Sequence, residues 1–189
     1  MPVPELATVR LRLRGFTDLD RGAFAAVNAD PEVMRYMSRR LDRAQSDRFI
    51  DRILEGWTVH GFGLWAIQRV EDGAFLGFAG LSEPSFVAPF TPAIEVGWRL
   101  VRAAWGHGYA TEAGAAALEF GFEVLRREEI VSFTAVDNER SRRVMERLGM
   151  THDPADDFDY PLVAADHPIR RQVLYRLSRD QWMAWRIGG

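Results

Sequence analysis

One stretch, in which a strand runs directly into a glycine-rich turn and then a helix, constrains this chain more than any other feature. It extends from Glu95 to Gly114 and reads EVGWRLVRAAWGHGYATEAG, with Gly106 and Gly108 in the turn. Glycine lets a backbone adopt positive φ and approach a ligand closely. The first turn of a helix presents unpaired amide hydrogens at the positive end of its dipole. Together they predict an anion site, most simply for a phosphate or pyrophosphate.

Two other interpretations of this turn remain open from the residues alone. The glycines can simply save space. Gly106-His107-Gly108 also begins the dinucleotide-binding fingerprint, but Thr111 stands at its third glycine position. A Rossmann site normally lies on the first strand–helix unit, whereas this turn follows about 100 residues. All 24 basic residues are arginine, so a Walker A loop, which needs a lysine, is excluded.

Apolar periodicity predicts how the rest of the chain is organised. Strands are expected over residues 8–14, where Val9, Leu11 and Leu13 alternate, and over 64–70, 75–81, 93–101, 130–136 and 173–177. Asp72-Gly73 between two apolar runs predicts a hairpin. Residues 83–93 are expected to form a loop, as are residues 153–166, which hold five aspartates; an aromatic tail with Trp182 and Trp185 follows the last strand.

Capping signals predict where the helices begin and end. Asp18 or Asp20 is expected to cap a short first helix, and Asp30-Pro31-Glu32 to start a second. Asp42 and Gln45 have the spacing of a capping box. A helix after the glycine turn has an apolar stripe, and a last one starts at Asn138 and stops at Gly149. The stripe comprises Ala113, Ala116, Ala117, Phe120 and Val124.

The chain is expected to form one domain over residues 1–189, because it has no repeat or linker. The element order predicts an α/β (α+β) fold with a mixed central sheet of about six to seven strands and helices on both faces. Of its residues, 47% are hydrophobic and 27% charged, which suits a packed core. The net charge of -3 argues against nucleic-acid binding. Without cysteines, a signal peptide or a membrane-spanning run, a soluble cytoplasmic protein is expected.

Two motifs together resemble a known family. WGHGYATEA, followed about 30 residues later by NERSRRVMERLGM, resembles the ribosomal-protein-alanine acetyltransferase (RimJ/RimL-like) branch of the GCN5-related N-acetyltransferases (GNAT). The opening TVRLRLRGFTDLD and the closing RRQVLYRLSRDQW are similar to that branch too. The resemblance implies the GNAT fold, acetyl-coenzyme A as donor without a metal, and a primary amine as acceptor. A protein N-terminal α-amine or a small-molecule amine would fit, as would a monomer or a homodimer.

The resemblance also implies roles for cofactor-binding residues. The family's pyrophosphate loop, Q/R-x-x-G-x-G/A, falls on Trp105, Gly108 and Ala110, with tryptophan in place of the polar residue. The pyrophosphate should bind the backbone amides of His107, Gly108, Ala110 and Thr111. The pantetheine arm should pair with the backbone of Leu100, Val101 and Arg102. Asn138 should hydrogen-bond the pantetheine, and Arg143 should lie near the adenosine end.

The resemblance further implies how the acetyl group is transferred. Similar proteins often use an acid at the position of Glu95 as general base, directly or through water. Strand alternation puts Glu95, Gly97 and Arg99 on one face, so Glu95 could instead be a structural partner of Arg99. Met145 replaces the tyrosine that protonates the leaving thiolate in many relatives. Ser141, one turn earlier, is the candidate acid; otherwise it serves the helix start or the cofactor, and solvent protonates the thiolate.

Two questions about the acceptor stay open. An α-amine with a pKa near 8 is roughly a tenth neutral at pH 7, far more than a lysine amine, so a glutamate base favours an α-amine. The lack of the tyrosine leaves room for a non-catalytic acyl-coenzyme A-binding domain. Some residues could border the acceptor or simply pack: residues 34–37, Phe86, Phe90, Trp98 and His167. The four histidines have no metal spacing, so no metal ligand is predicted.

Overall fold

The computed structural model describes residues 3–188, which build one mixed nine-stranded sheet with helices on both faces. The strand order is β1-β2-β3-β4-β5-β6-β9-β7, with β8 beside β9. Six strands have four or more residues and match the expected six to seven: β2 (Leu11–Arg14), β3 (Leu64–Arg69), β4 (Phe75–Ser82), β5 (Glu95–Leu100), β6 (Glu129–Ala135) and β9 (Arg171–Ser178). The other three have two residues each: β1 (Leu6–Ala7), β7 (Thr151–His152) and β8 (Phe158–Asp159).

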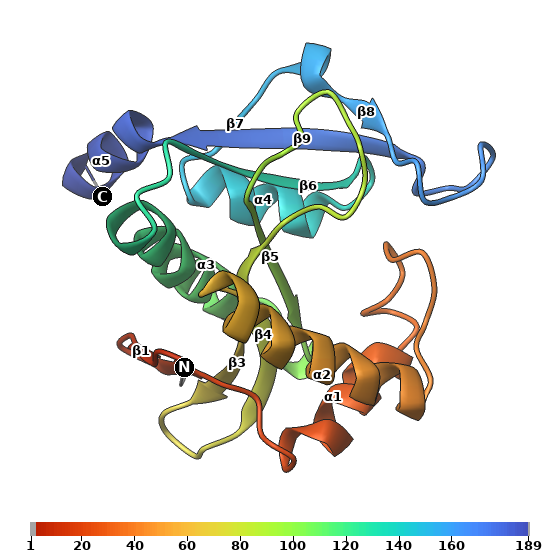
Figure 1. Cartoon of the computed structure of the whole chain (residues 1–189), viewed down its shortest axis with the longest axis vertical. Helices are drawn as coiled ribbons and strands as arrows, with labels where there is room; N and C mark the ends of the chain where they lie inside the picture. The colour runs from red at the N-terminus through yellow and green to blue at the C-terminus, as the bar shows by residue number, and fades with distance from the viewer. Residues whose placement is uncertain (1–2, 189) are drawn as a thin grey trace.

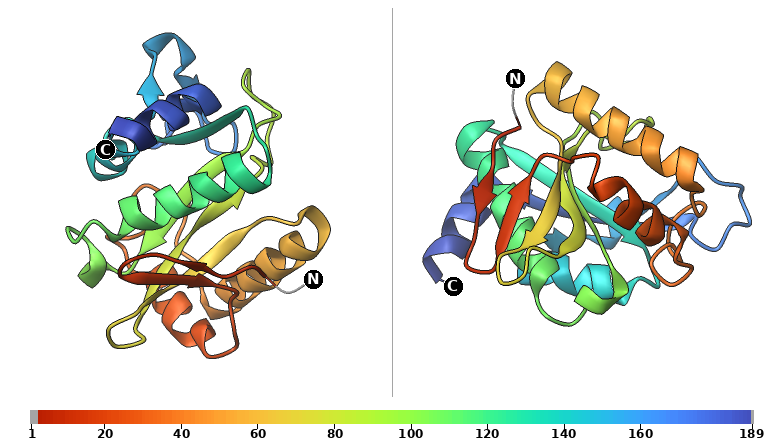
Figure 2. Two further views of the ribbon diagram at one scale, coloured as in Figure 1. Left: turned by 90° about the vertical axis from the view of Figure 1, so that its left-hand side faces the viewer. Right: turned by 90° about the horizontal axis from the view of Figure 1, so that it is seen from below.

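Helices cover the two faces of the sheet in pairs (Figures 1 and 2). Helices α1 (Asp20–Ala29) and α2 (Arg43–His60) lie on the face that carries Arg99, which contacts Asn28 and the ring of Phe49. Helices α3 (Tyr109–Glu119) and α4 (Glu139–Arg147) pack together on the other face. Helix α5 (Arg179–Gly188) follows β9, and short helical turns are η1 (Arg102–Ala104), η2 (Phe120–Val124) and η3 (Pro154–Asp156).

The only parallel pair of the described sheet, β5 and β6, separates soon after it begins. Its single register pair is Glu95 with Val131. One step further, the hydroxyl of Ser132 rather than a backbone amide donates to the carbonyl oxygen of Val96, at 2.8 Å. Beyond that point the strands diverge, and Figure 1 shows β6 and β9 set apart from β3 and β4. The divergence leaves a gap in the middle of the sheet, where polar backbone groups have no neighbouring strand.

The predicted first strand is interrupted by a turn. Leu11 and Leu13 are fully buried as expected, but Val9 is 93% exposed. The hydroxyl of Thr8 accepts from the Leu11 amide, and the Thr8 amide donates to the Leu11 carbonyl. The residues before this turn form β1, which pairs back onto β2. The prediction that Val9 is buried was wrong, because the hydrogen bond between the Leu11 amide and the Thr8 hydroxyl closes a turn that joins β1 and β2 into a hairpin.

Two of the predicted helix starts differ in the structure. Helix α1 begins without a side-chain cap, since Asp20 turns back to form an ion pair with Arg14 at 2.7 Å and Asp18 pairs with Arg21. The chain after Asp30 forms consecutive turns rather than a second helix. The Asp30 carboxylate accepts hydrogen bonds from the backbone amides of Glu32 and Val33, but the turns that follow do not continue into the regular hydrogen bonding of a helix.

The remaining helix signals are confirmed except at three places. The capping box of Asp42, the Asn138 cap and the positive φ of Gly149 are all present. Val124 is 62% exposed, because the end of its helix widens into the π-helical turn η2 and shifts the stripe. The aspartate-rich loop follows β7 and includes η3 and β8, and the aromatic tail is helix α5.

No helix within residues 3–188 is both long and apolar enough to cross a membrane.

Ser132 gives a direct test of how the two parallel strands are held together. We expect Ser132→Ala to lower the free energy of unfolding by about 1–3 kcal/mol, because the buried carbonyl of Val96 loses its donor. Thermal denaturation should show a loss of about 2–4 °C per kcal/mol. The control Ser85→Ala removes an exposed hydroxyl and should change stability by less than about 0.5 kcal/mol. Equal stability of both variants would show that this bond does not hold the strands.

Candidate active site

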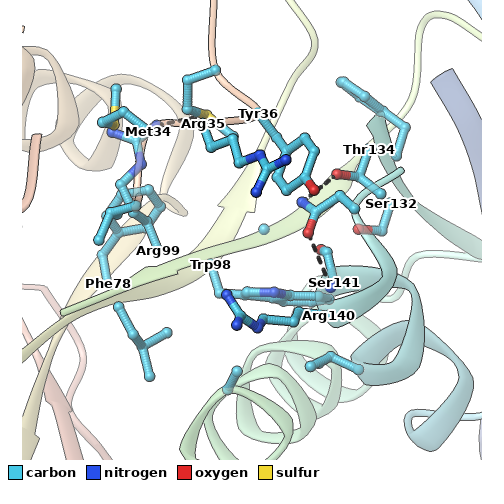
Figure 3. A pocket seen from close by; sticks show the side chains of 18 of the residues that line it. Met34, Arg35, Tyr36, Phe78, Trp98, Arg99, Ser132, Thr134, Arg140 and Ser141 are labelled. Atoms are coloured by element: carbon cyan, nitrogen blue, oxygen red, sulfur yellow. Dashed lines mark hydrogen bonds between the residues drawn. The ribbon is translucent and has the colours of Figure 1, made fainter. Parts of the chain in front are cut away.

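A cavity of about 1180 Å³ opens where β5 and β6 diverge. The exposed edges of both strands line it through Gly97, Trp98 and residues 132–134. The beginnings of α3 and α4 border one side, and the segment between α1 and α2 borders the other. Figure 3 shows Arg99 and Phe78 on one side of this space and Ser132, Thr134 and Ser141 across from them.

The turn before α3 has the features of an anion site. Gly108 caps the helix with φ of +80° and offers no side-chain acceptor, so the first amides of α3 remain without partners. The buried hydroxyl of Thr111 likewise has no hydrogen-bond partner. Unpaired donors at the positive end of a helix dipole fit the phosphates of a nucleotide-bearing cofactor.

Arg10, in the turn between β1 and β2, holds this anion site from outside. Its guanidinium donates to the carbonyl oxygen of His107 at 2.9 Å and forms an ion pair with Glu112 at 2.6 Å. It also lies over the ring of Tyr109, 4.7 Å from the centroid. These contacts fix the conformation of the turn, so its amides are oriented before a ligand arrives.

Asn138 organises the start of α4 beside the cavity. Its side-chain oxygen accepts from the amide of Ser141, and its nitrogen donates to the hydroxyl of Thr134 at 2.8 Å. Each side-chain group of an asparagine can make a further bond. Asn138 is therefore fixed in orientation while keeping a donor and an acceptor for a ligand in the split.

Most of the sequence-predicted residues come together in this cavity, and three do not. Eight line it: Glu95, Leu100, Gly108, Ala110, Thr111, Asn138, Ser141 and Arg143. Val101, Arg102 and His107 are not part of its wall. The amide of Val101 donates to Leu76 at 2.8 Å, and the His107 ring stacks on Tyr109. A cofactor role stays a prediction for these three and for the residues that line the cavity.

Glu95 lies at the vertex of the split, where the two strands are last paired. Its side chain leans along β5, with Oε1 3.7 Å from the position that a Cβ on Gly97 would occupy. Burial alone raises the pKa of this carboxyl to about 8. Arg99 is not its ion-pair partner, because that guanidinium donates to Asn28 at 2.6 Å instead. Glu95 is thus a desolvated carboxyl that faces the cavity and is half ionised near pH 8.

The candidate acid and the residue at the tyrosine position have different surroundings. Ser141 borders the cavity, whereas Met145 is only 1% exposed and packs in the hydrophobic core. Of these two α4 residues, only Ser141 could therefore donate a proton to a thiolate in the cavity, and water is the other possible donor.

Residues 34–37, which were expected to border the acceptor, line the cavity, whereas Phe133 and Tyr160 line it without having been assigned from the sequence. Tyr36 crosses above the cavity and donates to the carbonyl of Asp137 at 3.0 Å (Figure 3). Tyr160 and Phe133 form an aromatic wall, with Phe86 and Phe90 packed behind it and not in contact with the cavity. His167 also lies outside the cavity wall. Tyr160 follows the aspartate-rich loop, where no periodicity indicates which side chains point inward.

Within residues 3–188, no group of three His, Asp or Glu side chains is placed to hold a metal ion. Four of the five loop aspartates are instead held by local partners, such as Asp156 with Arg176 at 2.6 Å.

A split sheet with unpaired donors at a helix start on one side and a desolvated carboxyl at its vertex has the features expected of a group-transfer site for a long, phosphate-bearing cofactor. Comparison with known proteins identifies the family. Residues 10–151 match the acetyltransferase (GNAT) domain, and the chain belongs to that family. It is therefore an acetyltransferase, and the members of this family use acetyl-coenzyme A.

The chain is also similar to individual proteins, two of which are named for acetyl transfer. The uncharacterized protein YkkB of Bacillus subtilis is 33% identical over 147 residues, covering 77% of this chain and 84% of YkkB. An FsC-acetyl coenzyme A-N(2)-transacetylase of Aspergillus fumigatus is 29% identical over 95% of this chain and 78% of its own. An acetyltransferase structure from Agrobacterium tumefaciens has a TM-score of 0.74 at 29% identity, covering 94% and 95% of the two chains.

The raised pKa of Glu95 predicts how stability depends on pH. Between about pH 4.5 and 8 the unfolded chain releases this proton while the folded protein keeps it. The free energy of unfolding should therefore fall with rising pH, by up to about 1.4 kcal/mol per unit from this group. Glu95→Gln removes the effect. Thermal denaturation should show the variant gaining stability over the wild type from pH 5 to 8, with no further gain above pH 8. A constant difference across this range would mean that Glu95 titrates normally.

Proposed function

We propose that this protein acetylates a primary amine by direct attack in a ternary complex, with Glu95 as general base and a peptide N-terminal α-amine as acceptor. The observation that carries the proposal is the carboxyl of Glu95, desolvated and facing the cavity at the vertex of the split. A ribosomal-protein-S5-alanine acetyltransferase from Vibrio fischeri shares the fold, with a TM-score of 0.74 at 14% identity. We propose the same branch of the family on the two sequence motifs.

The cavity suits a donor and an acceptor that approach from opposite sides. The amides before Thr111 and the amide group of Asn138 would hold the phosphates and the pantetheine arm in the split. The segment between α1 and α2 and the wall of Phe133 and Tyr160 would hold the acceptor. Two reactants fixed in one cavity need no covalent enzyme intermediate, and their orientation supplies much of the rate enhancement.

The pKa of Glu95 matches an α-amine better than a lysine amine. Bound acetyl-coenzyme A supplies an activated thioester, and the neutral amine forms the new N–C bond as the C–S bond breaks. Glu95 takes the proton that the amine loses, and Ser141 or water protonates the sulfur. A base with a pKa near 8 exchanges a proton with an α-amine of similar pKa at little cost, whereas a lysine amine holds its proton about two units more tightly.

Glu95→Gln tests the role of the base. We expect turnover to fall by about 10²–10⁴, because the amide cannot take up a proton, while the affinity for acetyl-coenzyme A is unchanged. In the wild type, activity should rise with pH up to about 8, and the variant should lack this rise. Coenzyme A release should be followed with an aromatic amine that stays neutral throughout, so that the profile reports the enzyme. Full activity of the variant from pH 6 to 9 would remove Glu95 as base.

Gly108→Glu tests the phosphate site. We expect at least a ~100-fold loss of acetyl-coenzyme A affinity in a calorimetric titration, because the new carboxylate repels phosphate at the helix start. Gly61→Glu is a matched control, since Gly61 has a similar φ of +74° at the end of α2, away from the cavity. It should show similar backbone strain with normal affinity. Normal affinity of a folded Gly108→Glu variant would place the phosphates elsewhere.

A further inference from the structure

The acceptor side of the cavity is lined by arginines that have no carboxylate partner. Arg35, Arg39 and Arg52 stand exposed at its mouth, and Arg99 lies further in. In the described part of the chain none of these four forms an ion pair, although most of the other arginines do. Among the described residues that line the cavity, Glu32 is the only acidic one contributed by α2 or by the segment between α1 and α2. This side of an acidic protein is therefore electropositive.

Arg99 is the least hydrated of the four. It donates from Nη1 to the Asn28 oxygen at 2.6 Å and from Nη2 to the Met37 sulfur at 3.1 Å, and its buried Nε has no partner. The rings of Phe49 and Phe78 lie 5.8 and 5.3 Å from its guanidinium carbon. A guanidinium has five N–H donors, so each terminal nitrogen keeps one for a ligand. Burying a cation without a counterion is costly, and an anionic ligand would offset that cost.

The floor between Arg99 and the general base is open. Gly97 lies between them on the same face of β5, and a Cβ added there would meet only the Glu95 carboxylate. Packing therefore does not require glycine at this position, and its backbone does not adopt positive φ. Glycine within a strand often marks the close approach of a ligand. Because Glu95 leans over Gly97, its carboxyl lies about two residues, or about 7 Å along the strand, from the position where the Arg99 side chain leaves the backbone.

We propose that the acceptor carries a carboxylate, about 7 Å from its amine, that binds Arg99 while the amine lies at Glu95 and its chain crosses Gly97. The inference rests on the proposed function, which places the amine at Glu95. An extended peptide advances about 3.3–3.6 Å per residue, so this distance corresponds to the second or third residue. The carboxylate would come from the C-terminus of a short peptide or from an acidic side chain near the N-terminus of a longer one. Arg35 and Arg52 would attract it to the mouth.

Three matched acceptors test the proposal on the wild-type protein: the tripeptide Ala-Ala-Ala as free acid, its C-terminal amide, and the amide of Ala-Ala-Asp. We expect kcat/KM for the free acid to exceed that of its amide at least tenfold. High activity with the Ala-Ala-Asp amide would assign the carboxylate to a side chain, and low activity would assign it to a C-terminus. Equal activity with all three would overturn the proposal.

Arg99→Gln then tests which residue recognises the carboxylate. The ratio of free-acid to amide activity should fall to about one in this variant and stay unchanged in Arg127→Gln, an exposed arginine outside the cavity. A purely structural Arg99 would lower both activities equally and keep the ratio, which would contradict the assignment. If Arg99→Gln does not fold, Arg35→Gln at the exposed mouth provides the same test, with an expected fall of two- to fivefold in the ratio.

Equilibrium binding separates this inference from the proposed function. N-acetylated Ala-Ala-Ala, as free acid or amide, can be titrated into the complex of the protein with coenzyme A. Preferential binding of the acid without any acetyl transfer would support the carboxylate site at Arg99 and contradict the proposed function. Acetyl transfer without preference for the acid, in binding or turnover, would support the proposed function and overturn the carboxylate site at Arg99.

Discussion

The divergence of β5 and β6 is the feature on which the rest of this structure depends. Two parallel strands that pair only at Glu95 and Val131 leave their later backbone groups without a partner, and such groups are costly unless something binds them. The hydroxyl of Ser132 takes the last carbonyl before the gap. The helix starts at Gly108 and Asn138 then border the open space with further unpaired donors. A ligand with an extended, amide-bearing arm and phosphates can form hydrogen bonds with both the unpaired strand backbone and the unpaired donors at the helix starts.

The same divergence explains why the site holds ionisable groups at a cost in stability. Glu95 lies at the vertex, too enclosed for full hydration, and burial raises its pKa to about 8. Arg99, four residues later on the same face, is desolvated enough to lower its pKa to about 10. The two do not neutralise each other, because Arg99 is held by Asn28. A carboxyl and a guanidinium kept apart on one strand are a poor way to build a core, but they can each meet a different part of one substrate.

Much of this could be predicted from the sequence, and the exceptions have physical causes. The glycine turn, the capping box at Asp42 and the Asn138 cap could be predicted because they depend on the conformation and hydrogen bonds of residues close together in the sequence. Val9 was expected to be buried because it alternates with Leu11 and Leu13, but the hydrogen bond from the Leu11 amide to the Thr8 hydroxyl forms a turn that exposes Val9. Tyr160 enters the cavity from an irregular segment, where side-chain direction depends on tertiary contacts that no periodicity encodes. Residues 34–37 were expected at the acceptor side from the family resemblance, and they line the cavity, whereas Tyr160 was not expected there.

Hydrogen exchange with and without acetyl-coenzyme A tests most directly that the split between β5 and β6 is the cofactor site. Saturating acetyl-coenzyme A should slow amide exchange in residues 97–100, 108–111 and 132–141 and leave exchange in α5 and the β3–β4 hairpin unchanged. Saturable binding that protects other segments, or no protection at the edges of the split, would show that the cofactor does not bind between β5 and β6.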